Sequence, residues 1–66
     1  MKHFYFTELN TGEEFIVGAD TLSEAMAVAE EIGIDLVDNY GAGLPKVKFE
    51  YEMTEFEAEA SGLDEY

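Results

Sequence analysis

Two runs of aromatic and β-branched residues near the N-terminus constrain the fold of this chain most strongly. The runs cover residues 3–9 and 13–19, and Asn10-Thr11-Gly12 separates them. Residues of these types favour β-strands, and Gly12 can adopt the positive φ that a short hairpin loop requires. The sequence therefore predicts a β-hairpin with apolar side chains on both faces.

A capping box and a stripe of apolar residues predict a helix after this hairpin. In Thr21-Leu22-Ser23-Glu24, the Thr21 hydroxyl and the Glu24 carboxylate can each accept a hydrogen bond from a free backbone N–H group. Apolar residues then recur at helical spacing on one face, at Leu22, Ala25, Met26, Ala29 and Ile32. Gly33 follows this stripe directly and is typical of a helix end.

The segment between this helix and the next apolar run carries weaker signals. Residues 34–37 fit a short strand, whereas residues 38–45, with two glycines and a proline, indicate a turn-rich loop. From residue 46 to residue 54, apolar and polar side chains alternate. This alternation predicts a half-buried strand. One face of that strand would carry Val47, Phe49, Tyr51 and Met53.

The alternation breaks after Met53, so the last residues have more than one interpretation. Thr54-Glu55-Phe56-Glu57 fits a second capping box, and a helix there would carry Phe56, Ala60 and Leu63 on one face. Residues 53–66 are therefore expected to form a short helix or a loose acidic tail. Continued alternation through Phe56, Ala58 and Ala60 is a third interpretation.

Together these elements predict one α+β domain over residues 1–66, because so short a chain cannot bury enough surface for two domains. With the third strand beside the first, a ββαβ order gives a three-stranded antiparallel sheet in the order 2-1-3, and the helix packs on one face. The predicted core is Phe4, Phe6, Phe15, Val17, Leu22, Met26, Ala29, Ile32, Val47 and Phe49. On the face opposite the helix, Tyr5, Leu9 and Ile16 form a predicted surface for a homodimer.

The charge balance restricts the partners of the chain. Sixteen Asp and Glu residues face three Lys and no Arg, for a formal net charge of −13. Binding to nucleic acid or to an anionic membrane surface requires clustered Lys or Arg, so neither partner is expected. No apolar run approaches the ~20 residues that span a bilayer, and the N-terminal apolar run is too short for a secretory signal. A cytoplasmic protein is expected.

Residues that could support catalysis or ligand binding lack the necessary patterns. A nucleophilic site would combine His3 with Ser23 or Ser61, but neither serine follows a sharp strand-to-helix turn. Residues 35–39 offer oxygen ligands without the spacing of a calcium loop, and residues 41–43 lack the lysine of a phosphate loop. The absence of cysteine excludes thiolate sites. We expect no enzymatic activity, no cofactor and no metal site.

The unbalanced carboxylates are the remaining functional signal. Their mutual repulsion destabilises a compact chain, which favours a role toward a partner outside the chain. We expect carboxylates to substitute for phosphates at the basic nucleic-acid site of another protein. The alternative is a small interaction or dimerisation module whose acidic surface maintains solubility or suits high salt.

A phosphate mimic needs more than one row of carboxylates. Alternate residues of a strand lie ~6.8 Å apart, whereas one DNA strand advances ~3.4 Å per phosphate. The candidate partner-binding residues are Glu50, Glu52, Glu55, Glu57, Glu59, Glu24, Glu30 and Glu31. In size, acidity and lack of catalytic groups, the chain resembles small phage-encoded DNA-mimic inhibitors, such as anti-CRISPR, anti-restriction and uracil-DNA glycosylase inhibitor proteins. This resemblance implies an inhibitor or modulator that acts in the host cytoplasm.

Overall fold

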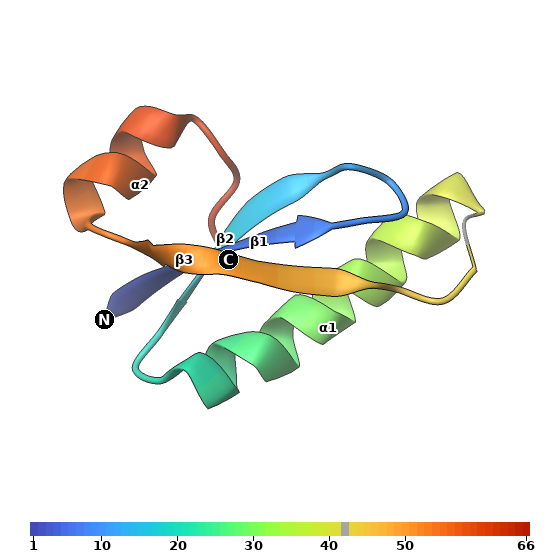
Figure 1. Cartoon of the computed structure of the whole chain (residues 1–66), viewed down its shortest axis with the longest axis horizontal. Coiled ribbons are helices and arrows are strands. Elements are labelled where there is room, and N and C mark those ends of the chain that lie inside the picture. The colour runs from blue at the N-terminus through green and yellow to red at the C-terminus, as the bar shows by residue number, and fades with distance from the viewer. Residues whose placement is uncertain (42) are drawn as a thin grey trace.

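A three-stranded antiparallel sheet carries one helix on each face. The computed structural model describes residues 1–41 and 43–66, so Ala42 of the 41–43 segment lies outside the described residues. The elements are β1 (Lys2–Glu8), β2 (Glu14–Ala19), α1 (Leu22–Tyr40), β3 (Val47–Met53) and α2 (Glu55–Ser61). β1 pairs antiparallel with both other strands, so the sheet order is β2-β1-β3 (Figure 1). The predicted α+β class and strand order are confirmed.

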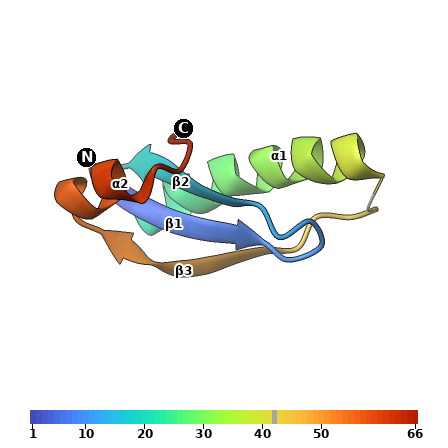
Figure 2. The ribbon, with the colours of Figure 1, turned by 90° about the horizontal axis from the view of Figure 1, so that it is seen from above.

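Small residues let α1 approach the aromatic side chains of the sheet. Ala25 and Ala29 are fully buried against Phe4, Phe6 and Phe15, and α1 runs along the length of the sheet (Figure 2). The Phe6 and Phe15 rings stack with their centroids 5.8 Å apart. Burial of each such large apolar side chain contributes about 1.5–3 kcal/mol to stability in gross terms, so this cluster is the main source of stability.

The predicted core is confirmed with one exception. Nine of its ten members are buried or packed against the buried cluster: Phe4, Phe6, Phe15, Val17, Met26, Ala29, Ile32, Val47 and Phe49. Leu22 is 40% exposed, because it is the first residue of α1 and lies at its end. The structure also buries residues that the sequence left out of the core, namely Ile16, Ala25, Val37, Met53 and Ala58.

The helix does not end at Gly33, which was the predicted end, but continues to Tyr40. Gly33 is buried, and a Cβ atom there would lie 2.6 Å from Val47 Cγ2 and 3.1 Å from Pro45 Cβ. The glycine therefore serves close packing of α1 on the start of β3 and does not terminate the helix. The chain leaves the helix at Gly41, whose φ of 66° is left-handed.

A bulge in β3 sends its side chains to both faces of the sheet. Phe49 pairs with Phe6 and Tyr51 pairs with Tyr5, so Glu50 between them has no counterpart on β1. One extra residue shifts the alternation of the strand by one position. Phe49 therefore packs under α1, whereas Tyr51 lies on the opposite face, edge-on to Tyr5. The prediction of a single apolar face for this strand is wrong.

α2 covers part of the sheet face opposite α1. The predicted capping box is present, because Thr54 Oγ1 accepts a hydrogen bond from Glu57 N at 3.1 Å and Glu57 Oε1 accepts one from Thr54 N at 3.0 Å. Ala58 packs with Ile16 and Met53 in a second apolar cluster. Of the interpretations of residues 53–66, the short helix is confirmed.

The last three residues pair with the outer edge of β2. The backbone N–H of Ile16 donates to the Asp64 carbonyl at 2.9 Å, and that of Tyr66 donates to the Ile16 carbonyl at 2.8 Å. This short parallel segment lies along one edge of the sheet, and Leu63, which directly precedes it, packs against the apolar cluster of Ile16, Met53 and Ala58. The chain end is therefore part of the fold.

Candidate functional site

Most of the negative charge faces solvent. Of the sixteen carboxylates, Glu8 is buried and Glu50 is half-buried, which leaves fourteen exposed. Across residues 1–41 and 43–66, one lysine–carboxylate ion pair forms, in which Lys48 Nζ lies 3.7 Å from Glu50 Oε1, and His3 Nδ1 makes a hydrogen bond of 2.6 Å with Glu65 Oε2. The surface thus carries a large excess of carboxylates over cationic partners.

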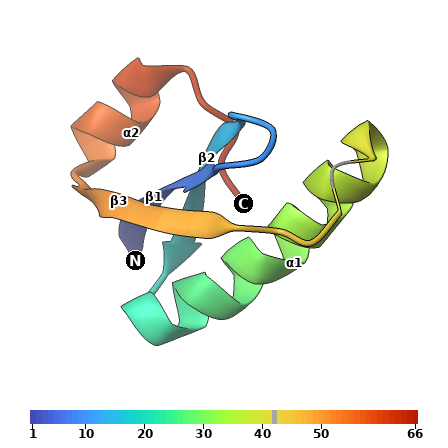
Figure 3. The same ribbon diagram turned by 45° about the vertical axis from the view of Figure 1, so that its right-hand side comes forward.

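The predicted partner-binding carboxylates do not form one surface. Glu24, Glu30 and Glu31 lie on α1, whereas Glu55, Glu57 and Glu59 lie on α2, and all six are exposed. The two helices pack on opposite faces of the sheet, as Figure 3 shows. A flat partner surface can contact one of these groups at a time. We call Glu55, Glu57 and Glu59 the α2 carboxylates.

The bulge separates the two candidate residues of β3. Glu50 Oε2 accepts a hydrogen bond from Thr7 Oγ1 at 2.8 Å, and the same side chain pairs with Lys48. Glu52 is opposite Phe4 on β1, so it belongs to the face that carries α1, and it is exposed. These two residues therefore do not make the row of carboxylates that simple alternation predicts.

α1 carries a longer acidic stripe than the sequence suggested. Its members are Glu24, Glu31, Asp35 and Asp38, which lie on one exposed face because of their helical spacing. The two aspartates were missed because the helix was expected to end at Gly33. A polar outer face is also what any amphipathic helix presents to water.

The first capping box is only half formed. Thr21 Oγ1 accepts a hydrogen bond from Glu24 N at 3.2 Å and donates one to Glu24 Oε1 at 3.1 Å. The Glu24 carboxylate thus bonds the Thr21 hydroxyl, whereas the complete box would have it bond the Thr21 backbone N–H. Glu57 of α2 makes that backbone contact in the second box, so its carboxylate has a structural role as well.

Glu8 is a buried carboxylate that the sequence interpretation missed. Its Oε1 accepts a hydrogen bond from Thr11 N at 2.8 Å, and its Oε2 accepts one from Lys46 N at 2.6 Å. Burial raises the pKa of Glu8, but the backbone donors of Lys46, Thr11 and Asn10 outweigh this effect and hold the pKa below its usual value. The carboxylate joins the hairpin loop to the connection between α1 and β3. The sequence did contain a signal for this burial: Glu8 follows Phe4 and Phe6 at every second position of the strand, so it shares their face of the sheet.

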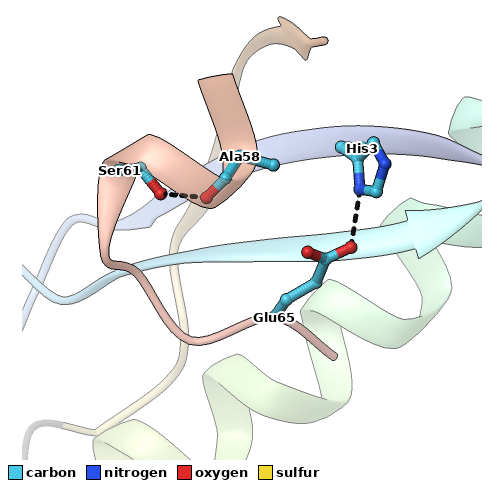
Figure 4. Close-up of polar contacts among 4 residues, drawn as sticks. All are labelled: His3, Ala58, Ser61 and Glu65. Carbon is cyan, nitrogen blue, oxygen red and sulfur yellow. Dashed lines mark hydrogen bonds and ion pairs between the residues drawn. The ribbon is translucent and has the colours of Figure 1, made fainter. Parts of the chain in front are cut away.

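The residues of a hypothetical nucleophilic site do not meet. Ser61 Oγ donates a hydrogen bond to the Ala58 carbonyl at 2.7 Å, while His3 pairs with Glu65 (Figure 4). Asp35, a candidate calcium ligand by its sequence position, lies within α1. In the part of the chain that the structure describes, no group of three His, Asp or Glu side chains is arranged to hold a metal ion.

A hollow of about 330 Å³ lies between α1 and the start of β3. Its lining consists of Glu30, Ile34, Pro45, Lys46 and Val47. It therefore offers one carboxylate and one ammonium group on a mainly apolar wall. None of these lining residues is a Ser, Thr or Cys nucleophile paired with a general base.

The exposed apolar residues also differ from prediction. Ile16 is completely buried and Tyr5 is half-buried, so with Leu9, which is 50% exposed, they do not form the homodimer surface that the sequence predicted. Conversely, Phe56, which was expected to share an apolar helix face with Ala60 and Leu63, is 79% exposed. The small Ala58 takes the inner position.

Comparisons with known proteins provide no relative. No protein family, curated protein or solved structure matches the chain. Among the helices of the described residues, none combines the length and the apolar character needed to cross a membrane. A functional proposal must therefore rest on the surface chemistry of the chain.

Proposed function

We propose that the protein is an acidic nucleic-acid mimic that inhibits or modulates a nucleic-acid-processing protein by occupying its basic site. The observation that carries the proposal is the fourteen exposed carboxylates; within the described residues, the one lysine–carboxylate ion pair engages the half-buried Glu50. Like charges at this density repel one another and reduce stability. A basic partner surface would turn the same charges into favourable contacts.

The α2 carboxylates are the preferred contact group. They lie on a short helix that buries little of itself, so a partner can approach them without disturbing the aromatic core under α1. Glu50 is less suited than the sequence suggested, because Thr7 and Lys48 already engage its carboxylate. The α1 stripe is the second group and serves as the comparison.

Electrostatic attraction sets the expected behaviour of such a complex. Opposite net charges steer the two proteins together, so association is fast at low salt and slows as salt rises. Charge pairs that lose water at an interface can contribute several kcal/mol, whereas exposed charges contribute little to folding. Such targets work where nucleic acid is processed, so the proposal also implies a cytoplasmic location.

The test captures basic proteins from the extract of a candidate host cell on the immobilised chain. We expect captured partners to be released by added DNA or RNA and to bind more weakly as salt rises. The variant Glu55→Gln, Glu57→Gln, Glu59→Gln keeps side-chain size, and Gln retains the cap at position 57. We expect it to lose affinity and to flatten the salt dependence.

The matched control removes three charges from the other helix, by Glu31→Gln, Asp35→Asn and Asp38→Asn. Both variants have the same net charge, so a difference between them locates the contact. If the α2 variant and the α1 control both bind as the unmodified chain does, the carboxylates serve solubility alone and the proposal is contradicted. Loss of binding by the control alone would transfer the site to the α1 stripe.

A further inference from the structure

Phe56 points away from the body of the molecule. Ala58, two residues later on α2, packs against Ile16 and Met53. Because successive helical residues are ~100° apart, Phe56 lies about 160° around the helix from Ala58. The Phe56 side chain is accordingly 79% exposed.

The α2 carboxylates flank this ring on both sides. On a helical projection Glu55 and Glu59 lie to one side of Phe56 and Glu57 lies to the other. All three are exposed. A partner that approaches these charges from outside must therefore also meet the ring. Single exposed apolar residues are common on proteins, but aromatic residues, including Phe, are enriched at the cores of interfaces, which have polar rims.

We infer that the partner surface is a groove for single-stranded nucleic acid, in which basic residues flank an exposed aromatic side chain. Single-strand sites hold phosphates with Lys and Arg and stack unpaired bases on aromatic rings. The α2 carboxylates would take the place of phosphates, and the Phe56 ring would take the place of a base. This inference rests on the proposed function and names the class of partner.

A site for double-stranded nucleic acid fits the same surface less well. In a duplex the bases are stacked inside, and the outer surface offers phosphates, sugars and base edges. An exposed ring flanked by carboxylates has no counterpart there. The separation of the acidic groups onto two sheet faces also argues against a broad duplex-like surface.

The first experiment uses two synthetic peptides as probes, Lys-Trp-Lys-Trp-Lys and Lys-Ala-Lys-Ala-Lys. The chain contains no tryptophan, so tryptophan fluorescence reports on the peptide alone. Amide chemical shifts of the labelled protein measure binding of both peptides. If Phe56 accepts an aromatic partner, the tryptophan peptide should bind at least about fivefold more tightly, since one stacking contact contributes ~1–3 kcal/mol.

Substitutions separate the ring from general apolarity. Phe56→Ala should remove the preference for the tryptophan peptide, and Phe56→Leu should remove most of it, because leucine is apolar but cannot stack. Leu44→Ala is the matched control, since Leu44 is 86% exposed and lies in the connection at the other end of β3. We expect the control to bind both peptides as the unmodified chain does. Both positions are exposed, so circular dichroism should show unchanged folding for all three variants.

Equal affinity for the two peptides, or a preference that survives Phe56→Ala, would overturn the inference. The α2 triple Gln variant distinguishes this result from failure of the proposed function. If that variant binds Lys-Ala-Lys-Ala-Lys as well as the unmodified chain does, the α2 carboxylates are not the basic-partner site. The proposed function fails if the α1 control variant also binds this peptide unchanged. If only the tighter binding of the tryptophan peptide is absent, the proposed function stands without the stacking contact.

A second experiment tests the class of partner with proteins captured from the extract. Oligodeoxythymidine and duplex DNA are added at equal phosphate concentration. The inference predicts captured proteins that meet two conditions. Oligodeoxythymidine releases them at a lower concentration than duplex DNA does. The Phe56→Ala bait retains at least about fivefold less of them than the unmodified bait does. Equal release by both polymers, or equal retention by both baits, would refute it. If neither polymer releases anything, the proposed function fails as well.

Discussion

The two faces of the sheet are covered in different ways. On one face, α1, which has 19 residues, covers a continuous cluster of phenylalanine rings. On the opposite face, α2 has 7 residues and shares a small cluster of Ile16, Met53 and Ala58 with the chain end. Apolar burial provides most of the stability of a small domain, so the α1 face determines folding. The α2 face encloses less and presents Phe56 and the α2 carboxylates outward.

This contrast predicts that the α1 face tolerates substitution least. Phe6 is completely buried and lies against the rings of Phe15 and Phe49. Phe6→Ala should reduce the free energy of unfolding by about 3–5 kcal/mol, which is enough to unfold a domain of this size. Phe56→Ala on the other side should change it by less than about 0.5 kcal/mol. Urea denaturation followed by circular dichroism measures both, and equal losses would show that stability is not concentrated under α1.

Gly33 tests how closely α1 must approach β3. Alanine favours helices by about 1 kcal/mol over glycine, yet its Cβ would lie 2.6 Å from Val47 Cγ2. We expect the steric conflict to dominate, so Gly33→Ala should destabilise the fold by about 1–3 kcal/mol.

The double variant with Val47→Ala provides the control for Gly33. Removing the Val47 methyl groups should recover part of the loss, which gives a coupling energy between the two positions. A more stable Gly33→Ala protein, measured by thermal denaturation, would mean that α1 shifts on the sheet without cost.

We expect Glu8 to determine how the stability of the fold declines at acidic pH, which we call the acid limb of the stability profile. Its pKa is held below the usual value, so its contribution is complete above its ordinary pKa and is lost as pH falls through the lower, folded value. Protonation of the exposed carboxylates has the opposite effect, because it relieves repulsion. Stability should therefore hold or rise from neutral pH to about 5 and fall below about 4.

Glu8→Gln is the matching variant. One amide N–H₂ would face a backbone N–H donor of Thr11 or Lys46, so the variant should lose about 1–3 kcal/mol at neutral pH. It should also show a smaller decline in acid, as thermal scans at several pH values can establish. An unaltered acid limb would assign that limb to other groups.

The smallest expected effect concerns the exposed charges. Neutralising the α2 carboxylates to Gln should stabilise the fold by less than about 1 kcal/mol at low salt, because few cations offset the net charge of −13. Moderate salt should raise the midpoint of the unmodified chain and reduce the difference between the two proteins. Destabilisation of the Gln variant in low salt would indicate that native contacts of these carboxylates, such as the bond that Glu57 accepts from Thr54 N, outweigh the repulsion.

The sequence predicted those features that neighbouring residues specify together. The loop at Gly12, the capping box at Thr54 and the apolar stripe of α1 each need only short-range contacts. All are present, except that Leu22, the first predicted member of the stripe, is exposed. The strand order followed as well, because three strands and one crossover leave few arrangements. Hydrogen bonding and helical periodicity act over a few residues, so a sequence displays them directly.

The tertiary structure decided the features that depend on distant residues. Gly33 is a packing site because Val47 lies against it, and Ile16 is buried in a cluster with Met53, Ala58 and Leu63. The β3 bulge, the burial of Glu8 and the outward position of Phe56 were likewise settled by segments far away in the sequence. A glycine, an extra strand residue or an exposed ring has the same local pattern in several folds. Its role is determined by the steric and hydrogen-bonding contacts that only the assembled sheet and helices create.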